Sequence, residues 1–452
     1  MNNRIAIPRA MRGSSAHPRP WPRALLWLAM LGPLFFLCYG FANNWAAQLP
    51  HVGSYVFGWE RHIPFLPWTI LPYMSIDAFY AGSLFLCATR SELDTHAKRL
   101  LAATLISVTC FMLFPLQFSF IRPETHGFNG ALFALLTGFD KPFNQAPSLH
   151  ISLLMLLWVV YARHLRGALR WLMHGWFVLI GISVFTTWQH HVIDGAGGIV
   201  VGLLCLYLFP DHAVRWKVDK EIDARRRTLA RRYLFGALAC AGLACTMRSA
   251  TWLLLWPAIS LLIVSLAYGR FGSSAFQKQQ GSHSAAARVL LAPYRLGAWL
   301  SSRWLTAHRK TSVEVEAGVW IGRAPGSEDW RHCPARAVLD LTAEFEAGAQ
   351  ARKLQYINIA MLDLVAPTQE QLHLAVQALN RLRSHGPVLV HCALGYSRSA
   401  MVIAAWLLQQ GRTVTVHGAL TRIGVVRPHI VVPESHLAVL KEYHRALLVR
   451  HD

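Results

Sequence analysis

The stretch VLVHCALGYSRS, residues 388–399, places a cysteine at the end of an apolar run and an arginine six positions later. A strand that ends near Cys392 and a helix that begins near Ser399 leave the backbone N–H groups between them pointing into one small concavity, which is an anion site. The field of such a loop favours the nucleophilic thiolate form of the cysteine. The guanidinium of Arg398 can hold two phosphoryl oxygens in a bidentate fork. These residues predict transfer of a phosphoryl group to a cysteine.

This HCxxGxxRS arrangement resembles the signature of the dual-specificity type of cysteine-dependent tyrosine phosphatase, and the likeness extends over about residues 313–450. The resemblance implies that Cys392 is the nucleophile, that Arg398 binds the phosphate and that Ser399 helps the thiolate to leave. The loop residues whose backbone would bind the phosphate are Ala393, Leu394, Gly395, Tyr396 and Ser397. The alternative is a buried structural cysteine in an ordinary strand-to-helix turn.

The family also needs a general acid that protonates the leaving alcohol or phenol, which is usually an aspartate on an upstream loop. Asp363 in AMLDLVAPT follows the apolar run YINIAM and fits that place, unless it only caps a turn. Asp340 is a weaker candidate because it lies within AVLDL, which predicts a strand. The loop between Cys392 and Arg398 has no lysine, which argues against polyanionic substrates.

A second group of chemically competent residues lies in the apolar half of the chain. NQAPSLHISLL places Ser148 and His150 where a loop poor in Lys and Arg enters an apolar run, and TTWQHHVIDGAGG places His190 and Asp194 at the start of another. The last two are one helical turn apart, so the aspartate can orient the histidine as a nucleophile. Ionisable groups in such positions are costly and are functional candidates.

These two segments resemble motifs of the type 2 phosphatidic acid phosphatase superfamily, over about residues 24–210. The resemblance implies that His190 is the nucleophile, Asp194 its partner and His150 the acid. Arg122, in FIRPE, and Ser148 would bind the phosphate. Interfacial histidines without a catalytic role are the alternative.

Three details qualify the second resemblance. Pro115 and Val184 stand where the superfamily has a lysine and an arginine, and these losses favour the branch that transfers head groups. His191 is a less favoured nucleophile because only His190 stands four positions before Asp194. The run GAGG that follows is more typical of close helix packing than of a phosphate cradle.

The composition of the chain indicates which kinds of structural element position these candidate site residues. The chain has 452 residues, of which 54% are hydrophobic, and its 44 Lys and Arg exceed its 23 Asp and Glu. The basic residues lie between apolar runs instead of forming one stripe, which favours membrane topology signals over a nucleic-acid surface. Apolar runs that span a membrane, or nearly so, begin near eight residues: Ala24, Trp68, Arg99, Ser148, Trp171, Asp194, Tyr233 and Ala250.

We therefore expect an N-terminal all-α polytopic membrane bundle of about eight helices, with six in the core that resembles the phosphatidic acid phosphatases. The first run reads as an uncleaved anchor. Loops 43–67, 120–147 and 188–193 are poor in Lys and Arg, whereas the alternate loops are basic. This pattern predicts that the amino terminus and everything after Gly269 face the cytoplasm, at an inner membrane of bacterial type.

After Val313 the composition becomes that of an α/β domain, in which the strand-like runs GVWIG, AVLDL, YINIAM and PVLVH alternate with helical patterns. We expect a central sheet flanked by helices. The preceding segment reads as a linker with either an interfacial helix or a solvated one. The expected divisions are a basic cytoplasmic tail (1–23), the membrane domain (24–210), a basic loop with two further membrane helices (211–269), the linker (270–312) and the phosphatase-like domain (313–452).

Together these features predict a bifunctional membrane phosphatase in phospholipid metabolism, with a histidine-dependent site on the outer face and a cysteine-dependent site in the cytoplasm. One alternative is a head-group transferase with an appended phosphatase. Another is a membrane-anchored tyrosine or dual-specificity phosphatase whose membrane half is not catalytic. We expect lipid phosphates, and also phosphoproteins, as substrates, and we expect no nucleic acid, cofactor or metal.

Overall fold

The computed structural model describes residues 19–211, 216–219, 221–246 and 250–449. The chain divides into two units, Met1–Asp211 and His212–Asp452. Most of the expected basic tail and parts of the expected 211–232 loop lie outside the described residues.

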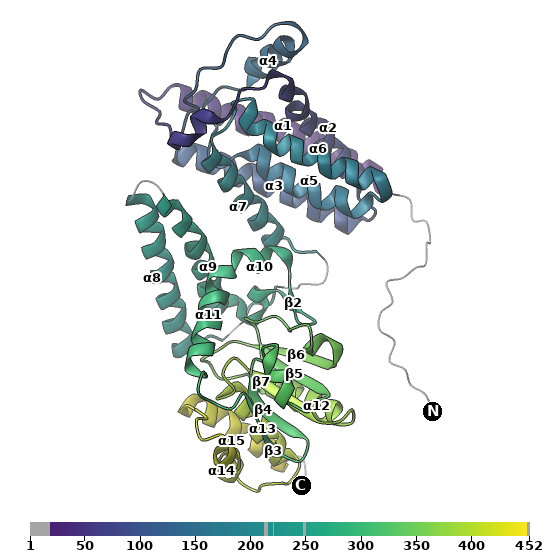
Figure 1. Ribbon diagram of the computed structural model, residues 1–452, viewed down its shortest axis with the longest axis vertical. Helices are drawn as coiled ribbons and strands as arrows, with labels where there is room; N and C mark the ends of the chain where they lie inside the picture. The colour runs from purple at the N-terminus through teal and green to yellow at the C-terminus, as the bar shows by residue number, and fades with distance from the viewer. Residues whose placement is uncertain (1–18, 212–215, 220, 247–249, 450–452) are drawn as a thin grey trace. The chain divides into compact units, whose positions relative to one another are not determined.

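The first unit is helical, as the apolar periodicity predicts (Figure 1). Its helices are α1 (Trp21–Ala47), α2 (Ile70–Leu86), α3 (Arg90–Leu113), α4 (Gly127–Phe139), α5 (Leu149–His164), α6 (Gly167–Thr186) and α7 (Val192–Leu208). Two short 3₁₀ turns, Gly58–His62 and Pro67–Thr69, lie between α1 and α2.

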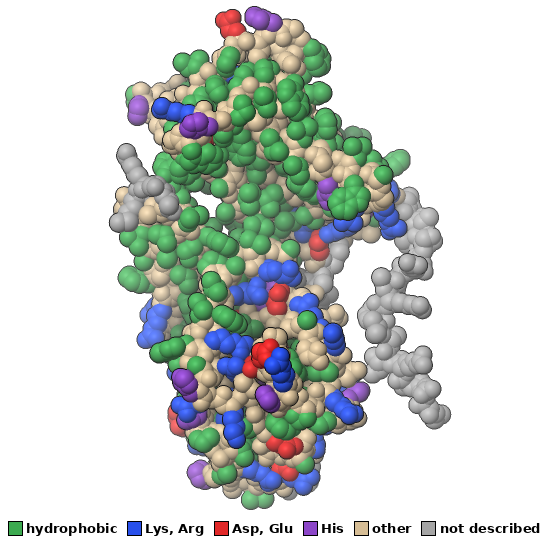
Figure 2. All heavy atoms as spheres, viewed as in Figure 1, with side chains coloured by type: hydrophobic (Ala, Val, Ile, Leu, Met, Phe, Trp, Pro, Cys, Tyr) green, Lys and Arg blue, Asp and Glu red, His purple; other side chains and the backbone are tan. Residues whose placement is uncertain are grey.

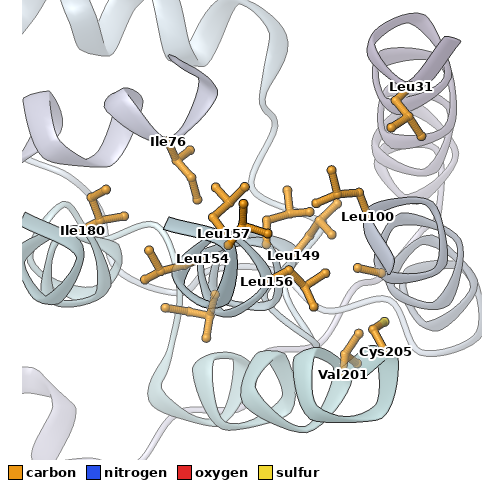
Figure 3. Packing of buried hydrophobic residues seen from close by; sticks show 14 of the residues in the cluster. Leu31, Ile76, Leu100, Leu149, Leu154, Leu156, Leu157, Ile180, Val201 and Cys205 are labelled. Carbon is orange, nitrogen blue, oxygen red and sulfur yellow. The ribbon is translucent and has the colours of Figure 1, made fainter. Parts of the chain in front are cut away.

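Helix α5 is the centre of this unit, in contact with α2, α3, α6 and α7. Leu154, Leu156 and Leu157 of α5 are buried, and Figure 3 shows them among side chains from the surrounding helices, including Ile76 of α2 and Ile180 of α6. A helix that is apolar on all sides is stable only when it is enclosed. The central position of α5 therefore fixes the place of its first turn, which carries His150.

The outside of the first unit is apolar, as a membrane domain requires. Helices α1, α3 and α6 are long and apolar enough to cross a membrane. Large side chains such as Leu26, Leu37 and Trp171 are largely exposed on them, and Figure 2 shows hydrophobic side chains over this unit. Soluble proteins rarely expose apolar patches of this extent. The unit is that of a multi-pass membrane protein.

Several charged residues of this unit form ion pairs at one end of the bundle. Arg23 at the start of α1 pairs with Asp94, and Arg163 at the end of α5 pairs with Glu92 and Asp211. The first residues of α5 and α7, which carry the histidine motifs, lie at the other ends of those helices. The basic end and the histidine end are thus separated by the length of the bundle.

The second unit contains a helical hairpin of α8 (Ala224–Thr246), which is basic at its start and apolar after Tyr233, and α9 (Leu255–Leu266) with the turns that continue it to Phe276; we call it the apolar hairpin. The stretch Thr251–Phe276, which includes α9, is long and apolar enough to cross a membrane. Helix α8 begins before Tyr233, so several arginines that we expected in a loop lie on its first turns.

The segment expected to be a linker, 270–312, is folded. It contains a short hairpin of β1 (Lys278–Gln279) and β2 (Ser282–His283), followed by α10 (Ala285–Leu290) and α11 (Ala292–Leu305). The expectation rested on its Ser, Gln and basic composition. The ammonium of Lys278 is in fact buried against the carboxylate of Asp340, 2.7 Å away, which no local pattern reveals.

A five-stranded sheet in the order β3-β4-β7-β5-β6 forms the core of the remaining chain. The strands are β3 (Ser312–Glu316), β4 (Val319–Arg323), β5 (Ala337–Thr342), β6 (Gln355–Met361) and β7 (Val388–Cys392). Only β3 is antiparallel to its neighbour, so the sheet is mixed. The expected α/β class is confirmed, and the short edge strand β3 was missed because charged residues alternate with valine in it.

Helices α12 (Gln369–Arg383) and α13 (Arg398–Gln409) pack on this sheet, and α14 (Val416–Val426) and α15 (Glu434–Val449) pack on α13. Nearly every residue of α13 is buried. The central strand β7 and the enclosed helix α13 therefore hold the cysteine loop between two rigid elements.

Candidate functional site

The cysteine loop runs from the end of β7 to the start of α13, as the motif predicts. The Sγ of Cys392 accepts a hydrogen bond from the backbone N–H of Gly395 at 3.2 Å and lies 3.4 Å from the Ser399 Oγ. Gly395 has a φ of 73°, and a Cβ there would lie 2.5 Å from the Gly322 carbonyl group. Only glycine fits such a position. The loop therefore closes around the sulfur and presents donors to it.

Arg427 fixes the direction of the loop's peptide groups. Its Nε donates to the carbonyl oxygen of Gly395 at 2.8 Å, and its Nη2 donates to that of Leu394 at 3.0 Å. A trans peptide directs its C=O and N–H to opposite sides. The N–H groups of Gly395 and Tyr396 therefore point to the inner side of the loop, where an oxyanion would bind.

Arg398 is held in place by acidic groups from other elements. Its two terminal nitrogens donate to the carboxylate of Glu344 at 3.1 and 2.7 Å, and Nη2 lies 3.0 Å from Asp363 Oδ1. Burial lowers the pKa of Arg398, but the carboxylates of Asp363 and Glu344 outweigh it and hold that pKa above its usual range. The arginine is a fixed cation at the loop's edge.

The proposed acid Asp363 lies on the turn after β6, one third exposed at 32% of its side-chain area. Its backbone carbonyl oxygen accepts a hydrogen bond from the hydroxyl of Tyr268 at 2.9 Å. The next residue, Leu364, has a left-handed φ of 62°, and its carbonyl oxygen accepts a hydrogen bond from Arg225 Nε. Residues of the apolar hairpin thus hold the acid loop.

Asp340 is structural, as its place in a strand predicts. It lies in β5, and the hydroxyl of Tyr356 donates to its carboxylate at 2.6 Å beside the Lys278 ammonium. Burial raises the pKa of Asp340, but Lys278, His391 and the hydrogen bond from Tyr356 together outweigh it and hold the pKa well below its usual range. His391 lies 3.8 Å from the same carboxylate, and burial lowers the pKa of this imidazole.

The histidine motifs of the first unit meet at the starts of α5 and α7. His190 Nδ1 lies 3.6 Å from Asp194 Oδ2, and His150 is close enough to interact electrostatically with His190. His150 stacks on Tyr73 with ring centroids 4.2 Å apart. His150 Nε2 and Arg122 Nε are buried without a hydrogen-bond partner among the described residues. Buried donors normally have a partner, and an oxyanion would satisfy both.

His191 is engaged elsewhere. Its Nδ1 lies 3.0 Å from the Glu60 carboxylate, and its Nε2 lies within hydrogen-bond distance of both the backbone N–H and the hydroxyl of Ser119. Both ring nitrogens are therefore occupied. His190 therefore stays the nucleophile that the sequence predicts.

Ser148 connects the two motif segments. Its Oγ caps α5 by accepting the N–H of Ile151, and its own N–H donates to the carbonyl oxygen of Asp194 at 2.8 Å. A Cβ on Gly198 would lie 2.5 Å from the Ser148 carbonyl oxygen, so this glycine of GAGG permits close packing of α7 on α5. Among the described residues, no cluster of three or more His, Cys, Asp or Glu could hold a metal ion.

Sequence reasoning missed the groups that complete each site. Glu344, Tyr268 and Arg427 support the cysteine loop, and Glu60 holds His191. The one available signal was the pair of acidic residues in TAEFE, directly after the strand AVLDL.

Both parts of the chain are similar to known protein families. The family model described as the dual specificity phosphatase catalytic domain matches residues 326–446, and that described as the PAP2 superfamily matches residues 72–208. The "phosphatidylglycerophosphatase and protein-tyrosine phosphatase 1" of Mus musculus is 30% identical over 163 residues, which cover 32% of this chain and 81% of the mouse protein. Its Rattus norvegicus counterpart is 29% identical with the same coverage.

A crystal structure of PTPMT1 in complex with PI(5)P is 25% identical and covers 31% of this chain and 99% of the crystallised chain, with a TM-score of 0.29. The chain belongs to the dual specificity phosphatases through its C-terminal domain and to the PAP2 superfamily through its N-terminal domain, and this fusion is a phosphoric monoester hydrolase.

Proposed function

We propose that this protein is a lipid phosphatase of a cytoplasmic membrane, in which the Cys392 site hydrolyses the phosphomonoester of a glycerophospholipid of the phosphatidylglycerophosphate class. The observation that carries the proposal is the arrangement of Arg398 and Asp363 around the sulfur, in a unit that also contains an apolar hairpin. The rodent relatives, which include phosphatidylglycerophosphatase in their names, support the lipid class.

In the first step, the Cys392 thiolate attacks phosphorus and the bond from phosphorus to the leaving oxygen breaks. The carboxyl group of Asp363 gives its proton to that oxygen. Arg398 holds the equatorial oxygens through its Nε–H, which has no partner among the described residues, and through the Nη2 N–H that otherwise faces Asp363. In the second step, water loses a proton to the Asp363 carboxylate and attacks the phosphorus of S-phosphorylated Cys392, and the bond between phosphorus and sulfur breaks. The Ser399 hydroxyl donates to the departing thiolate, and inorganic phosphate is released.

The histidine site supports a second phosphoryl transfer in the same protein. His190 would attack phosphorus while Asp194 orients its ring, and His150 would give a proton to the leaving group. Arg122 and Ser148 would bind phosphoryl oxygens. The unpaired buried nitrogens of His150 and Arg122 favour this role over a purely structural one. Water as acceptor completes hydrolysis, and an alcohol completes a head-group transfer.

The distribution of basic loops supports placing the Cys392 site in the cytoplasm and the histidine site on the outer face. In the first unit, the ion-paired basic end and the histidine end are separated, as that topology needs. A phosphoprotein substrate at the Cys392 site is the competing proposal, and it requires no lipid.

The test is phosphate release and lipid product mass from the detergent-purified full chain. Phosphatidylglycerophosphate, phosphatidic acid and a phosphotyrosine peptide serve as substrates for wild type, Cys392→Ser and His190→Ala. We expect Cys392→Ser to abolish hydrolysis of phosphatidylglycerophosphate, and His190→Ala to abolish a different lipid reaction. Loss of peptide dephosphorylation alone in Cys392→Ser would overturn the lipid assignment. Unchanged lipid products in His190→Ala, with and without an added alcohol acceptor, would show that the membrane half is not catalytic.

A further inference from the structure

A cavity of about 540 Å³ connects the cysteine site with the apolar hairpin of the same unit. Asp363 and Ala393 of the catalytic loops line one part of it, and Tyr233 of α8 and Leu261 of α9 line another. Helix α11 lies along it between these parts. Its volume is typical of sites that bind a small organic molecule.

The face of α11 that lines the cavity consists largely of small residues. Gly297, Ala298 and Ser301 contribute to the lining. Leu300 and Trp304, in contrast, are exposed outside the cavity. A helix with bulky apolar residues on its outer side suits a membrane interface, and its small residues leave room for a ligand on the inner side.

The cavity is tied to the catalytic groups through α11. The hydroxyl of Ser302 donates to the carbonyl oxygen of Ala393 in the cysteine loop at 2.9 Å. Arg295 Nε donates to the carbonyl oxygen of Glu344 at 3.1 Å. These bonds fix the helix beside the loop, so the cavity exists before a ligand binds. Its position relative to the sulfur is set by the fold.

The hairpin side of the cavity identifies the occupant. Leu261 belongs to the stretch Thr251–Phe276, which is long and apolar enough to cross a membrane. A ligand that extends from the cysteine loop along α11 to this helix must carry a phosphate at one end and a hydrocarbon chain at the other. A phosphotyrosine peptide has no such chain.

We infer that this cavity is an acyl-chain subsite of the Cys392 active site, which binds one hydrocarbon chain of a membrane lipid whose phosphate is in the loop. The inference rests on the proposed lipid phosphatase function and deepens it. It predicts that chain length contributes to kcat/KM, because each buried methylene adds about fourfold in affinity at about 0.8 kcal/mol.

Gly297 offers a clean perturbation. A Cβ at this position meets no atom within 4 Å, and the residue lies within a helix and lines the cavity, so a larger side chain there takes up cavity space. Gly297→Phe adds most volume, and Gly297→Ala raises helix propensity at least as much while adding little volume. Leu296→Phe adds bulk outside the residues that line the cavity and serves as the control.

The measurement is kcat/KM of the full chain in mixed micelles for dihexanoyl and dipalmitoyl phosphatidylglycerophosphate, each divided by kcat/KM for p-nitrophenyl phosphate. We expect Gly297→Phe to lower this ratio by about tenfold or more for the long-chain lipid and less for the short-chain lipid. Leu296→Phe should retain the wild-type ratios, and Gly297→Ala should lower the long-chain ratio by less than Gly297→Phe. Equal ratios in wild type and Gly297→Phe would overturn the subsite while leaving the lipid function intact. Absence of lipid hydrolysis in wild type would overturn both.

Discussion

Replacement of Tyr268 by phenylalanine tests whether the apolar hairpin positions Asp363, the proposed general acid. Its hydroxyl donates to the carbonyl oxygen of Asp363 at 2.9 Å, and Arg225 donates to that of Leu364. Leu364 has a φ of 62°, a conformation that costs a residue with a side chain about 1–2 kcal/mol. The two hydrogen bonds offset this strain and keep the carboxylate of Asp363 beside Arg398.

The size of the effect follows from those contacts. A neutral hydrogen bond contributes about 0.5–1.5 kcal/mol, which is comparable with the strain at Leu364. Removing the hydroxyl therefore shifts the loop by about 1 kcal/mol toward relaxed conformations, a factor of about five. We expect kcat to fall about fivefold with an alkyl phosphate, whose alkoxide must be protonated, and by less with p-nitrophenyl phosphate.

The matched control is Tyr233→Phe, which removes the hydroxyl of the ring that stacks on Tyr268 with centroids 5.4 Å apart. It should leave the ratio of the two kcat values unchanged. Adding Leu364→Gly to Tyr268→Phe should restore part of the alkyl phosphatase activity, because glycine adopts the left-handed conformation without this strain. Equal losses with both substrates, or no rescue by glycine, would refute the reasoning.

Three further outcomes are expected. Glu344→Gln should lower kcat/KM for p-nitrophenyl phosphate by about 10- to 100-fold. The reason is that a bidentate charged contact worth about 1.5–3 kcal/mol orients Arg398. An unchanged kcat/KM would show that Arg398 does not need this contact. Burial lowers the pKa of His283 and His436 to about 4, so the unfolded chain binds more protons than the native one between about pH 6.5 and pH 4. Thermal melts should therefore show stability falling as pH drops through this window, by about 1.4 kcal/mol per pH unit for each histidine, and a flat profile would contradict the assignment. Lys278→Met should lower the free energy of unfolding by about 3–5 kcal/mol, because it leaves the buried Asp340 carboxylate without its cation. Adding Asp340→Leu to Lys278→Met should recover much of this loss in denaturant titrations. Additive losses would show that the two side chains do not stabilise the fold as a pair.

The sequence by itself determined the local geometry of each motif, because each depends on contiguous backbone. A strand, a five-residue loop and a helix place Cys392 and Arg398 at the two ends of one loop, and a helical turn places His190 near Asp194. Apolar periodicity likewise determined the helical first unit and the α/β class of the phosphatase domain. These inferences involve neighbours along the chain, so they need no knowledge of the fold.

Only the tertiary structure decided which distant groups complete the sites. Glu344 lies 54 positions from Arg398, and Glu60 lies 131 positions from His191. No periodicity relates such residues, because side chains far apart in sequence meet only where strands and helices pack. For the same reason composition alone predicted a linker over 270–312, whereas packing places α11 against the cysteine loop as a wall of the adjoining cavity. The local motif predicts the reaction, and the packing of the fold decides which distant residues position the motif.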